Sequence, residues 1–441
     1  MNEWLCPRTF KKCCNYLIKV YWHAKGLIFM TLQEITRINL TKAGKFCRMW
    51  LGDINNDGRM EILMVQPDSH FDDRYWPHSV QAVTAFDLEG NLLWQIGEID
   101  PDAQGSGADI PCQVYDINRD GQLEIICAMD DHLCIFNGKD GSFISKHPLP
   151  DEHAHDCIMI CDLEGTGYPQ NIIVKNRYHK AWALDKNFNV MWEHEGNTGH
   201  YPWCYDLDGD GHDEVIIGYD VLNYKGETLW KIDMKDHADC IWVGDINQDG
   251  KIELVVGGDD FTAWTNDGKL LWRFTDTVES QNVAIGNLRP DLPGLEVCGL
   301  DRIDRSNPGL DGIFIVSSTG ECLYKEKRTI PGWSSVCTVI NNLDGKHTDH
   351  VLAYRRGGGM PNAVYDGYLN TIFNFPFVGY VAWGDLTDRD TDQLIVYSND
   401  EAVIYSSCEI DITKTQNKTL PQPKRLYNNT RYWGGEAYKK D

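Results

Sequence analysis

The sequence predicts an all-β protein, a single β-propeller with eight blades that each contain four antiparallel strands. A short Asp-rich loop recurs eight times in 441 residues, and short apolar runs flank each copy. Turn dipeptides separate further β-rich runs, as they do in hairpins, and no long stretch has the periodicity of a helix. Four short strands in a unit of about forty residues are typical of a propeller blade. Seven blades are the alternative if a weaker copy is not a true blade.

The Asp-rich loop occurs in four well-formed and four weaker copies. The well-formed copies are DINNDGRME from Asp53, DINRDGQLE from Asp116, DLDGDGHDE from Asp206 and DINQDGKIE from Asp245. The weaker copies are DLEGTGYPQ from Asp162, NLRPDLPGLE from Asn287, NLDGKHTDH from Asn342 and DLTDRDTDQ from Asp385.

Each loop lies in the same order of strands. Around Asp245, the strand CIWVG precedes the loop, ELVVGG and FTAWT follow it, and the turn NDGK leads to LLWRF. The tryptophan of this last strand recurs as Trp94, Trp192, Trp230 and Trp272. The final unit, 380–407, supplies only three strands. We therefore expect the segment EITRINL (34–40) to provide the fourth strand and close the ring, which removes exposed sheet edges.

We expect one propeller domain over residues 31–410, an N-terminal extension over 1–30 and a C-terminal tail over 411–441. The net charge of −25 argues against a nucleic-acid binder, and no apolar run has membrane-spanning length. Many of the fifteen cysteines lie in apolar runs, and no leader pattern opens the chain. These features predict buried free thiols and a cytoplasmic location. They leave the oligomeric state open.

The four well-formed loops predict calcium sites. Their oxygen side chains at positions one, three, five and nine suit a hard cation. In two weaker copies, Lys346 and Arg389 occupy position five of the loop instead. The expected ligands are Asp53, Asn55, Asp57, Glu61, Asp116, Asn118, Asp120, Glu124, Asp206, Asp208, Asp210, Glu214, Asp245, Asn247, Asp249 and Glu253. Because these ligands repeat blade by blade, a structural role is expected. The alternative is Asx-type turns in which the carboxylates cap backbone N–H groups.

The Asp-rich loops join the first and second strands of the blades, so we expect them on one face of the propeller. The opposite face is the expected place for chemistry. His200, Asp239, Asp156 and Gln281 each lie six residues before the first residue of a loop, so we expect them around the central channel at similar depth. Converging polar side chains in a concave funnel form a default site hypothesis. The candidates on this face are His155, Arg177, Tyr178, His179, His200, Tyr201, His237, Asn282, Arg302, Trp333, Arg355 and Arg356. The alternative for any one histidine is a hydrogen bond to a neighbouring loop.

The units GHYPWCYDLDGDGHDEVIIGYDVLNYKGETLW and DHADCIWVGDINQDGKIELVVGG resemble FG-GAP-type propeller repeats. They are similar to the calcium-containing propellers of polysaccharide lyases, including rhamnogalacturonan, ulvan and rhamnose–glucuronate lyases. The resemblance covers roughly residues 46–407. Integrin-type modules without enzyme activity share the repeat, but the histidine-bearing segments GHYPW and DHADC favour the lyases. The resemblance implies β-elimination on a uronic-acid-containing glycan, with calcium in a mainly structural role.

Such an elimination removes a proton next to a carboxylate, so a cation must neutralise that carboxylate and a base must take the proton. Arg177, Arg355 and Arg356 are candidate cations because arginine binds carboxylates in a bidentate manner. His155, His200, His237 and Tyr178 are candidate bases or acids. The remaining candidates would bind substrate, and Trp76 and Trp333 could stack on sugars. The acidic surface favours a short oligosaccharide as substrate.

Two alternatives stay open. The first is a non-catalytic propeller that binds a glycan or a protein, with calcium as scaffold. The second is a hydrolase that uses a pair among Asp130, Asp131, Asp239, Asp259 and Asp260. Such an enzyme would need two carboxylates about 5–10 Å apart.

Overall fold

The computed structural model describes residues 31–441 except 69–78, 104–108, 233, 235–236, 302–311, 327–333, 347, 356–362, 378, 388–390, 414–433 and 438–441. Contacts within the chain divide it into two units, Met1–Thr31 and Leu32–Asp441. The second unit is the propeller. In the part of the chain that the structure describes, no helix has the length and apolar character needed to cross a membrane.

Eight antiparallel sheets form the propeller and confirm the predicted all-β, eight-bladed fold. Blade 1 contains β2 (Arg48–Gly52), β3 (Glu61–Pro67), β4 (Val80–Phe86) and β5 (Leu92–Gly97). Blade 2 contains β6 (Cys112–Tyr115), β7 (Glu124–Met129), β8 (His132–Asn137) and β9 (Phe143–Pro148). Blade 3 contains β10 (Ile158–Cys161), β11 (Asn171–Lys175), β12 (Lys180–Leu184) and β13 (Val190–Glu195). Blade 4 contains β14 (Trp203–Tyr205), β15 (Glu214–Ile217), β16 (Asp220–Leu222) and β17 (Thr228–Lys231).

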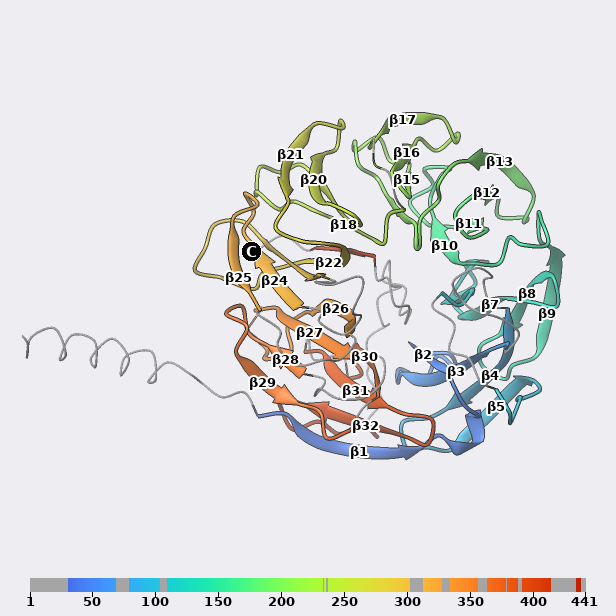
Figure 1. Ribbon diagram of the computed structural model, residues 1–441. Helices are drawn as coiled ribbons and strands as arrows, with labels where there is room; N and C mark the ends of the chain where they lie inside the picture. The colour runs from blue at the N-terminus through green and yellow to red at the C-terminus, as the bar shows by residue number, and fades with distance from the viewer. Residues whose placement is uncertain are drawn as a thin grey trace, which may run out of the picture. The chain divides into compact units, whose positions relative to one another are not determined.

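The remaining blades repeat this order. Blade 5 contains β18 (Cys240–Gly244), β19 (Glu253–Gly257), β20 (Phe261–Thr265) and β21 (Leu270–Phe274). Blade 6 contains β22 (Ser280–Gly286), β23 (Glu296–Asp301), β24 (Gly312–Val316) and β25 (Cys322–Lys325). Blade 7 contains β26 (Ser334–Ile340), β27 (His350–Arg355), β28 (Ala363–Tyr365) and β29 (Thr371–Asn374). In the ring of Figure 1, first strands such as β18 and β22 lie nearest the centre and fourth strands such as β17 and β21 lie at the rim.

Blade 8 closes the ring with strands from both ends of the propeller. It contains β30 (Tyr380–Gly384), β31 (Gln393–Tyr397) and β32 (Glu401–Ser406), and β1 (Gln33–Asn39) pairs antiparallel with β32 as the fourth strand. The predicted closing strand is therefore confirmed. The short helix η1 (Thr41–Ala43) then leads into blade 1. The strand β33 (Gly435–Glu436), from the expected tail, pairs parallel with β18 and gives blade 5 a fifth strand.

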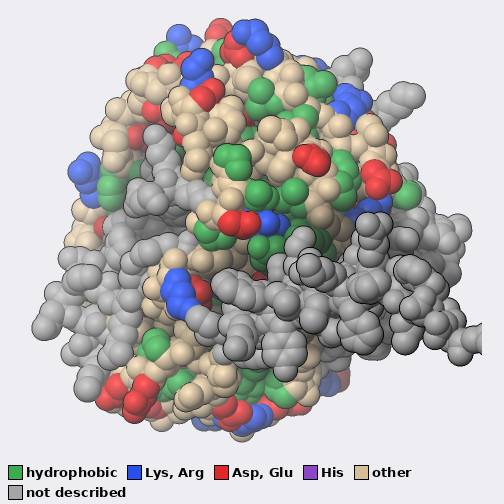
Figure 2. All heavy atoms as spheres, turned by 90° about the vertical axis from the view of Figure 1, so that its left-hand side faces the viewer, with side chains coloured by type: hydrophobic (Ala, Val, Ile, Leu, Met, Phe, Trp, Pro, Cys, Tyr) green, Lys and Arg blue, Asp and Glu red, His purple; other side chains and the backbone are tan. Residues whose placement is uncertain are grey.

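Burial explains the apolar runs that marked the strands. The strand β18 (CIWVG) is buried along its whole length, because blade 5 packs against a neighbouring blade on each face. Fourth strands have one outward face, and in β21 Leu270 and Leu271 are 46% and 39% exposed. Figure 2 shows hydrophobic side chains at the surface among charged side chains of both signs.

The recurring tryptophans connect each blade to the next one. The indole N–H groups of Trp94, Trp192, Trp230 and Trp272 donate to turn carbonyls of the following blade at 2.9–3.1 Å. A turn glycine packs against each of these rings, and a Cβ at Gly268 would lie 2.8 Å from Trp230. The sequence marked these tryptophans as a strand signal, and the structure shows that they hold neighbouring blades together.

We predict that Gly268→Ala lowers the free energy of unfolding more than Gly167→Ala does. Both glycines have positive φ, which costs about 1–2 kcal/mol for alanine. Only Gly268 is close to an indole, so its variant adds an overpacking cost of about 1–3 kcal/mol. Urea unfolding of both variants checks this. Equal losses would show that the glycine–tryptophan contact does not stabilise the interface.

Candidate functional site

The topology separates two sets of polar residues. Each Asp-rich loop joins the first strand of a blade to the second, so the loops lie at one end of the first strands. The segments that enter the first strands lie at the opposite end, together with the turns between second and third strands. These two ends carry chemically different clusters.

The four well-formed loops share one pattern of hydrogen bonds. In blade 1, Asp53 Oδ2 accepts the N–H of Gly58 at 2.9 Å and Asn55 Oδ1 accepts the N–H of Asp57 at 2.8 Å. The glutamate at position nine caps the start of the loop, because Glu61 Oε2 accepts the N–H of Ile54 at 2.9 Å. Equivalent caps come from Glu124, Glu214 and Glu253. The Asx-type turns considered from the sequence are therefore present.

The charges of these loops go beyond what capping requires. In the weaker loops of blades 3 and 8, Asn171 and Gln393 make the same cap with a neutral amide oxygen. Burial and neighbouring aspartates raise the pKa of Glu61 to about 8. Burial likewise raises the pKa values of Glu124, Glu214 and Glu253 to about 7. A bound cation would offset this clustering of negative charge.

In two of the well-formed loops the geometry fits such a cation. The carboxylates of Asp116, Asp120 and Glu124 lie close enough to share one ion, as do those of Asp206, Asp208 and Asp210. Asp245 Oδ1 is buried and accepts no hydrogen bond from the described residues. The weaker loop of blade 6 carries its own cation instead, since the Arg289 guanidinium pairs with both carboxylate oxygens of Asp291 at 2.7 Å. The donor sets of the well-formed loops therefore suit calcium.

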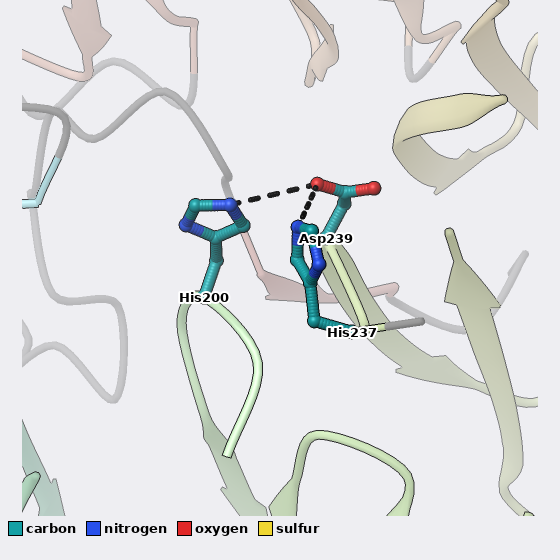
Figure 3. A group of neighbouring side chains, drawn as sticks. All are labelled: His200, His237 and Asp239. Atoms are coloured by element: carbon teal, nitrogen blue, oxygen red, sulfur yellow. Dashed lines mark ion pairs between the residues drawn. The ribbon is translucent and has the colours of Figure 1, made fainter. Parts of the chain in front are cut away.

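At the opposite end, four side chains from three blades converge. His200 precedes β14, His237 and Asp239 precede β18, and Tyr178 lies between β11 and β12. The Tyr178 hydroxyl is 3.3 Å from His200 Nε2, and its ring lies 4.9 Å from that of His237 between centroids. The two imidazole centroids are 5.1 Å apart. Figure 3 shows both imidazoles next to the Asp239 carboxylate.

Tyr178 has an unusual backbone conformation at this position. Its φ of 74° lies in the left-handed region, which is costly for an aromatic residue and is found mainly where the surroundings enforce it. The Asn176 side chain supports this turn by accepting the N–H groups of His179 and Lys180. The preceding residue, Arg177, is buried in the interior. The Tyr178 hydroxyl is thus held beside His200.

A buried ionic network lies behind the four side chains. Arg177 contacts Asp156 at 2.7 Å and Asp109 at 3.1 Å, and the Lys175 ammonium pairs with Asp156. Asp109 Oδ2 is also 3.3 Å from His200 Nδ1. Burial lowers the pKa of His200, and Asp109 and Asp239 offset only part of this effect. Burial therefore favours the neutral imidazole of His200.

Asp239 places one carboxylate oxygen between the two histidines. Its Oδ1 atom is buried and accepts no hydrogen bond from the described residues. His200 Nε2 lies 3.6 Å and His237 Nε2 3.5 Å from this oxygen. The three ligand atoms are close enough to hold one metal ion. Two imidazoles and a carboxylate suit a first-row divalent cation better than the all-oxygen loops do.

The structure places the predicted site residues in three groups. It brings Tyr178, His200 and His237 together, with Arg177 buried behind them. His155 Nδ1 lies 3.4 Å from Ser79 Oγ, and His179 is exposed. Arg302, Trp333 and Arg356, the stacking candidate Trp76, and the side chain of Arg355 lie outside the described residues. The roles of all these residues stay predictions.

Two predicted substrate-binding residues make contacts within the propeller. Tyr201 is buried, and its hydroxyl donates to the Ile158 carbonyl at 3.0 Å and accepts from Gln113 Nε2 at 2.9 Å. Asn282 is also buried, and its Oδ1 accepts the N–H of Cys337 in blade 7 at 2.7 Å. Both side chains connect blades.

The four residues that lie six positions before a loop were expected to surround the central channel. Three of them belong to one network. Asp156, His200 and Asp239 are all buried and are linked through Arg177 and Asp109, whereas Gln281 is half-buried. Sequence reasoning missed two members of the network. Asp109 lies seven residues before its loop, and Lys175 ends the apolar strand NIIVK. A lysine in such a buried strand was the available signal.

The aspartates that a hydrolase would use lie in different environments. Asp239 is buried beside two histidines, and Asp260 pairs with Arg273 at 2.6 Å. Asp130 and Asp131 form the left-handed turn between β7 and β8 and are exposed.

Comparison with known proteins points to one group of enzymes. No family model matches the chain. The chain is 23% identical over 340 residues to rhamnogalacturonan exolyase YesX of Bacillus subtilis (strain 168), covering 62% of this chain and 54% of that protein. It is 20% identical over 316 residues to rhamnogalacturonan endolyase YesW of the same organism, covering 56% of this chain and 50% of that protein. The chain thus spans about half the length of the curated relatives it matches.

Solved structures share the fold across most of the chain. The exotype rhamnogalacturonan lyase YesX matches with a TM-score of 0.60 at 17% identity, covering 93% of this chain and 76% of that chain. The V. cholerae biofilm matrix protein Bap1 matches with a TM-score of 0.61 at 12% identity, covering 92% and 91%. Relatives in sequence and fold therefore include rhamnogalacturonan lyases, but the fold alone does not separate an enzyme from a matrix protein.

We predict that Arg177→Leu lowers the free energy of unfolding by about 3–5 kcal/mol, because it leaves two buried carboxylates without their shared partner. The matched control is Arg273→Leu, whose ion pair with Asp260 is partly exposed, with an expected cost of about 0–1 kcal/mol. Chemical denaturation measures both values. A similar small loss in both variants would contradict the buried network described above.

Proposed function

We propose that this protein is a polysaccharide lyase that cleaves an acidic, uronic-acid-containing glycan by β-elimination. One observation supports this most strongly: four side chains from three blades converge, namely Tyr178, His200, His237 and Asp239. The Oδ1 atom of Asp239 is buried among them and accepts no hydrogen bond from the described residues. A repeated structural device would recur in each blade. This constellation combines residue types that differ from blade to blade, as a reaction centre requires.

Each part of the constellation has a role in elimination. His200, His237 and Asp239 would hold a divalent cation. Such a cation would neutralise the carboxylate of the sugar and make the neighbouring C–H more acidic. Tyr178 transfers the proton: its hydroxyl gives its own proton to the leaving oxygen as the C–O bond breaks, and its oxygen takes the proton from the carbon next to the carboxylate in exchange. A C=C bond forms, and no water is consumed.

The ionic network supplies rigidity in this proposal. Arg177 is already paired with Asp156 and Asp109, so we assign it to holding Tyr178 and His200 in place. This differs from its predicted role as the cation for the substrate carboxylate. A side chain held by packing and hydrogen bonds pays little reorganisation cost during the reaction.

The proposed substrate is a short acidic oligosaccharide of the rhamnogalacturonan type that binds in the central funnel. The curated relatives YesX and YesW are rhamnogalacturonan lyases. The net charge of −25 slows the approach of a long polyanion, which favours a short chain. The second candidate is a non-catalytic glycan-binding propeller. The fold is compatible with it, because the matrix protein Bap1 shares this fold.

We predict that incubation with rhamnogalacturonan oligosaccharides produces the ultraviolet absorbance of an unsaturated uronate. Tyr178→Phe should lower kcat about 100- to 10,000-fold, because it removes the proton-transfer group and keeps the ring. The control is Tyr224→Phe, whose ring stacks on His212 at the opposite end of blade 4, and it should retain activity. Binding without any absorbance change in the unmodified protein would support the glycan-binding alternative and contradict the lyase.

We also propose that the four well-formed loops bind calcium as structural staples. Their glutamates carry charges that capping does not need, because an amide makes the same cap in blades 3 and 8, and in the blade 6 loop an arginine pairs with an aspartate. Such sites would stabilise individual blades and lie away from the reaction.

We predict that chelated protein loses stability as pH rises from about 5 to 8. The folded-state pKa values of about 7 to 8 exceed that of an exposed glutamate, so the unfolded state ionises first and stability falls until the folded state also ionises. Calcium should remove this trend. Thermal melting at several pH values, with calcium or with EDTA, measures it, and identical curves under both conditions would exclude calcium staples.

A further inference from the structure

We infer that Asp109 is a positioning residue that fixes the tautomer of His200 and thereby directs the Nε2 lone pair of His200 towards Asp239. The consequence for cation binding rests on the proposed function, whereas the tautomer itself does not. Asp109 lies 91 residues before His200 in the sequence. It belongs to the segment that leads into blade 2, whereas His200 leads into blade 4. The contact therefore depends on the closed ring of blades.

Two carboxylates compete for the single proton of the neutral imidazole. Asp109 Oδ2 lies 3.3 Å from Nδ1 in hydrogen-bonding geometry, whereas Asp239 Oδ1 lies 3.6 Å from Nε2 and accepts no hydrogen bond from the described residues. An ionised carboxylate can only accept, so the proton belongs on Nδ1. The Nε2 atom then carries the lone pair, with the Tyr178 hydroxyl and Asp239 Oδ1 beside it.

Two lone pairs that face each other repel unless a donor or a cation lies beside them. His200 Nε2 and Asp239 Oδ1 face each other as two acceptors. The Tyr178 hydroxyl is one donor to Nε2, at 3.3 Å. A metal ion bound by both acceptors and by His237 would use the same lone pairs.

Asp109 is itself held in place by a chain of ion pairs. The oxygen that contacts His200 also accepts from Arg177 at 3.1 Å. Arg177 donates through two nitrogens to Asp156 Oδ1, at 3.0 and 2.7 Å. Lys175 holds the other oxygen of Asp156. The side chains of Asp109, Asp156 and Lys175 are fully buried, so the orientation of His200 is set from the interior of blades 2 and 3.

Removing the charge of Asp109 should therefore transfer the imidazole proton. In Asp109→Asn the carboxylate of Asp239 becomes the stronger acceptor, so the proton moves to Nε2. An Nε2–H group then hydrogen-bonds Asp239 and blocks the cation. Loss of a group that orients a metal-binding histidine typically weakens metal affinity about 10- to 100-fold.

The experiment is ¹⁵N NMR of histidine-labelled, metal-free protein at neutral pH, with the His200 signals assigned by their loss in His200→Gln. The expected result is a protonated Nδ1 and an unprotonated Nε2 in the unmodified protein, and the reverse in Asp109→Asn. Titration with Mn²⁺ in excess calcium should show at least tenfold weaker binding in Asp109→Asn. The matched control is Asp220→Asn, which changes another buried aspartate–histidine pair, with His194 at 2.9 Å, and should leave both readouts of His200 unchanged.

A protonated Nε2 in the unmodified protein would overturn the inference without any variant, so a poorly folded Asp109→Asn does not leave it untested. An unchanged tautomer in a folded Asp109→Asn would overturn it as well. If the tautomer behaves as expected but no unsaturated product forms, the inference about Asp109 stands and the lyase proposal fails. If the tautomer shifts but Mn²⁺ affinity stays the same, the part of the inference that concerns the cation is wrong.

Discussion

The antiparallel pairing of β1 with β32 is the constraint on which the other contacts of the propeller depend. It joins residues 33–39 to residues 401–406 and closes the row of sheets into a ring. In a closed ring the position of each first strand is fixed by both neighbours. The segments that enter blades 2 to 5 then meet at one place, where Asp109, Asp156, His200 and Asp239 form a connected network.

The two ends of the first strands illustrate how a repeat separates stability from chemistry. At one end, the same loop recurs, and its carboxylates cap backbone N–H groups in blade after blade. At the other end, equivalent positions carry different side chains, so aspartates and a histidine can combine into one asymmetric cluster. The backbone cost of holding Tyr178 at positive φ is found in that cluster.

The sequence was sufficient to predict the blades, the loops and the closing strand, because each depends on local patterns that repeat. It also pointed to His200 and Asp239, since both occupy the same position relative to a loop. It could not predict that Arg177 is neutralised by Asp156 and Asp109, because these contacts cross from blade to blade. Tyr201 and Asn282 were expected to meet substrate for a similar reason: polarity in a sequence does not show whether another blade already satisfies the group.

The central claim is that the His200, His237, Asp239 and Tyr178 cluster carries out elimination. Mass spectrometry of the products formed from rhamnogalacturonan oligosaccharides, with calcium and Mn²⁺ present, tests it most directly. Elimination predicts two fragments whose masses add up to that of the substrate, with the new non-reducing end one water lighter than a hydrolysis product. Fragments whose summed mass exceeds that of the substrate by one water, or a substrate that stays intact, would contradict the claim.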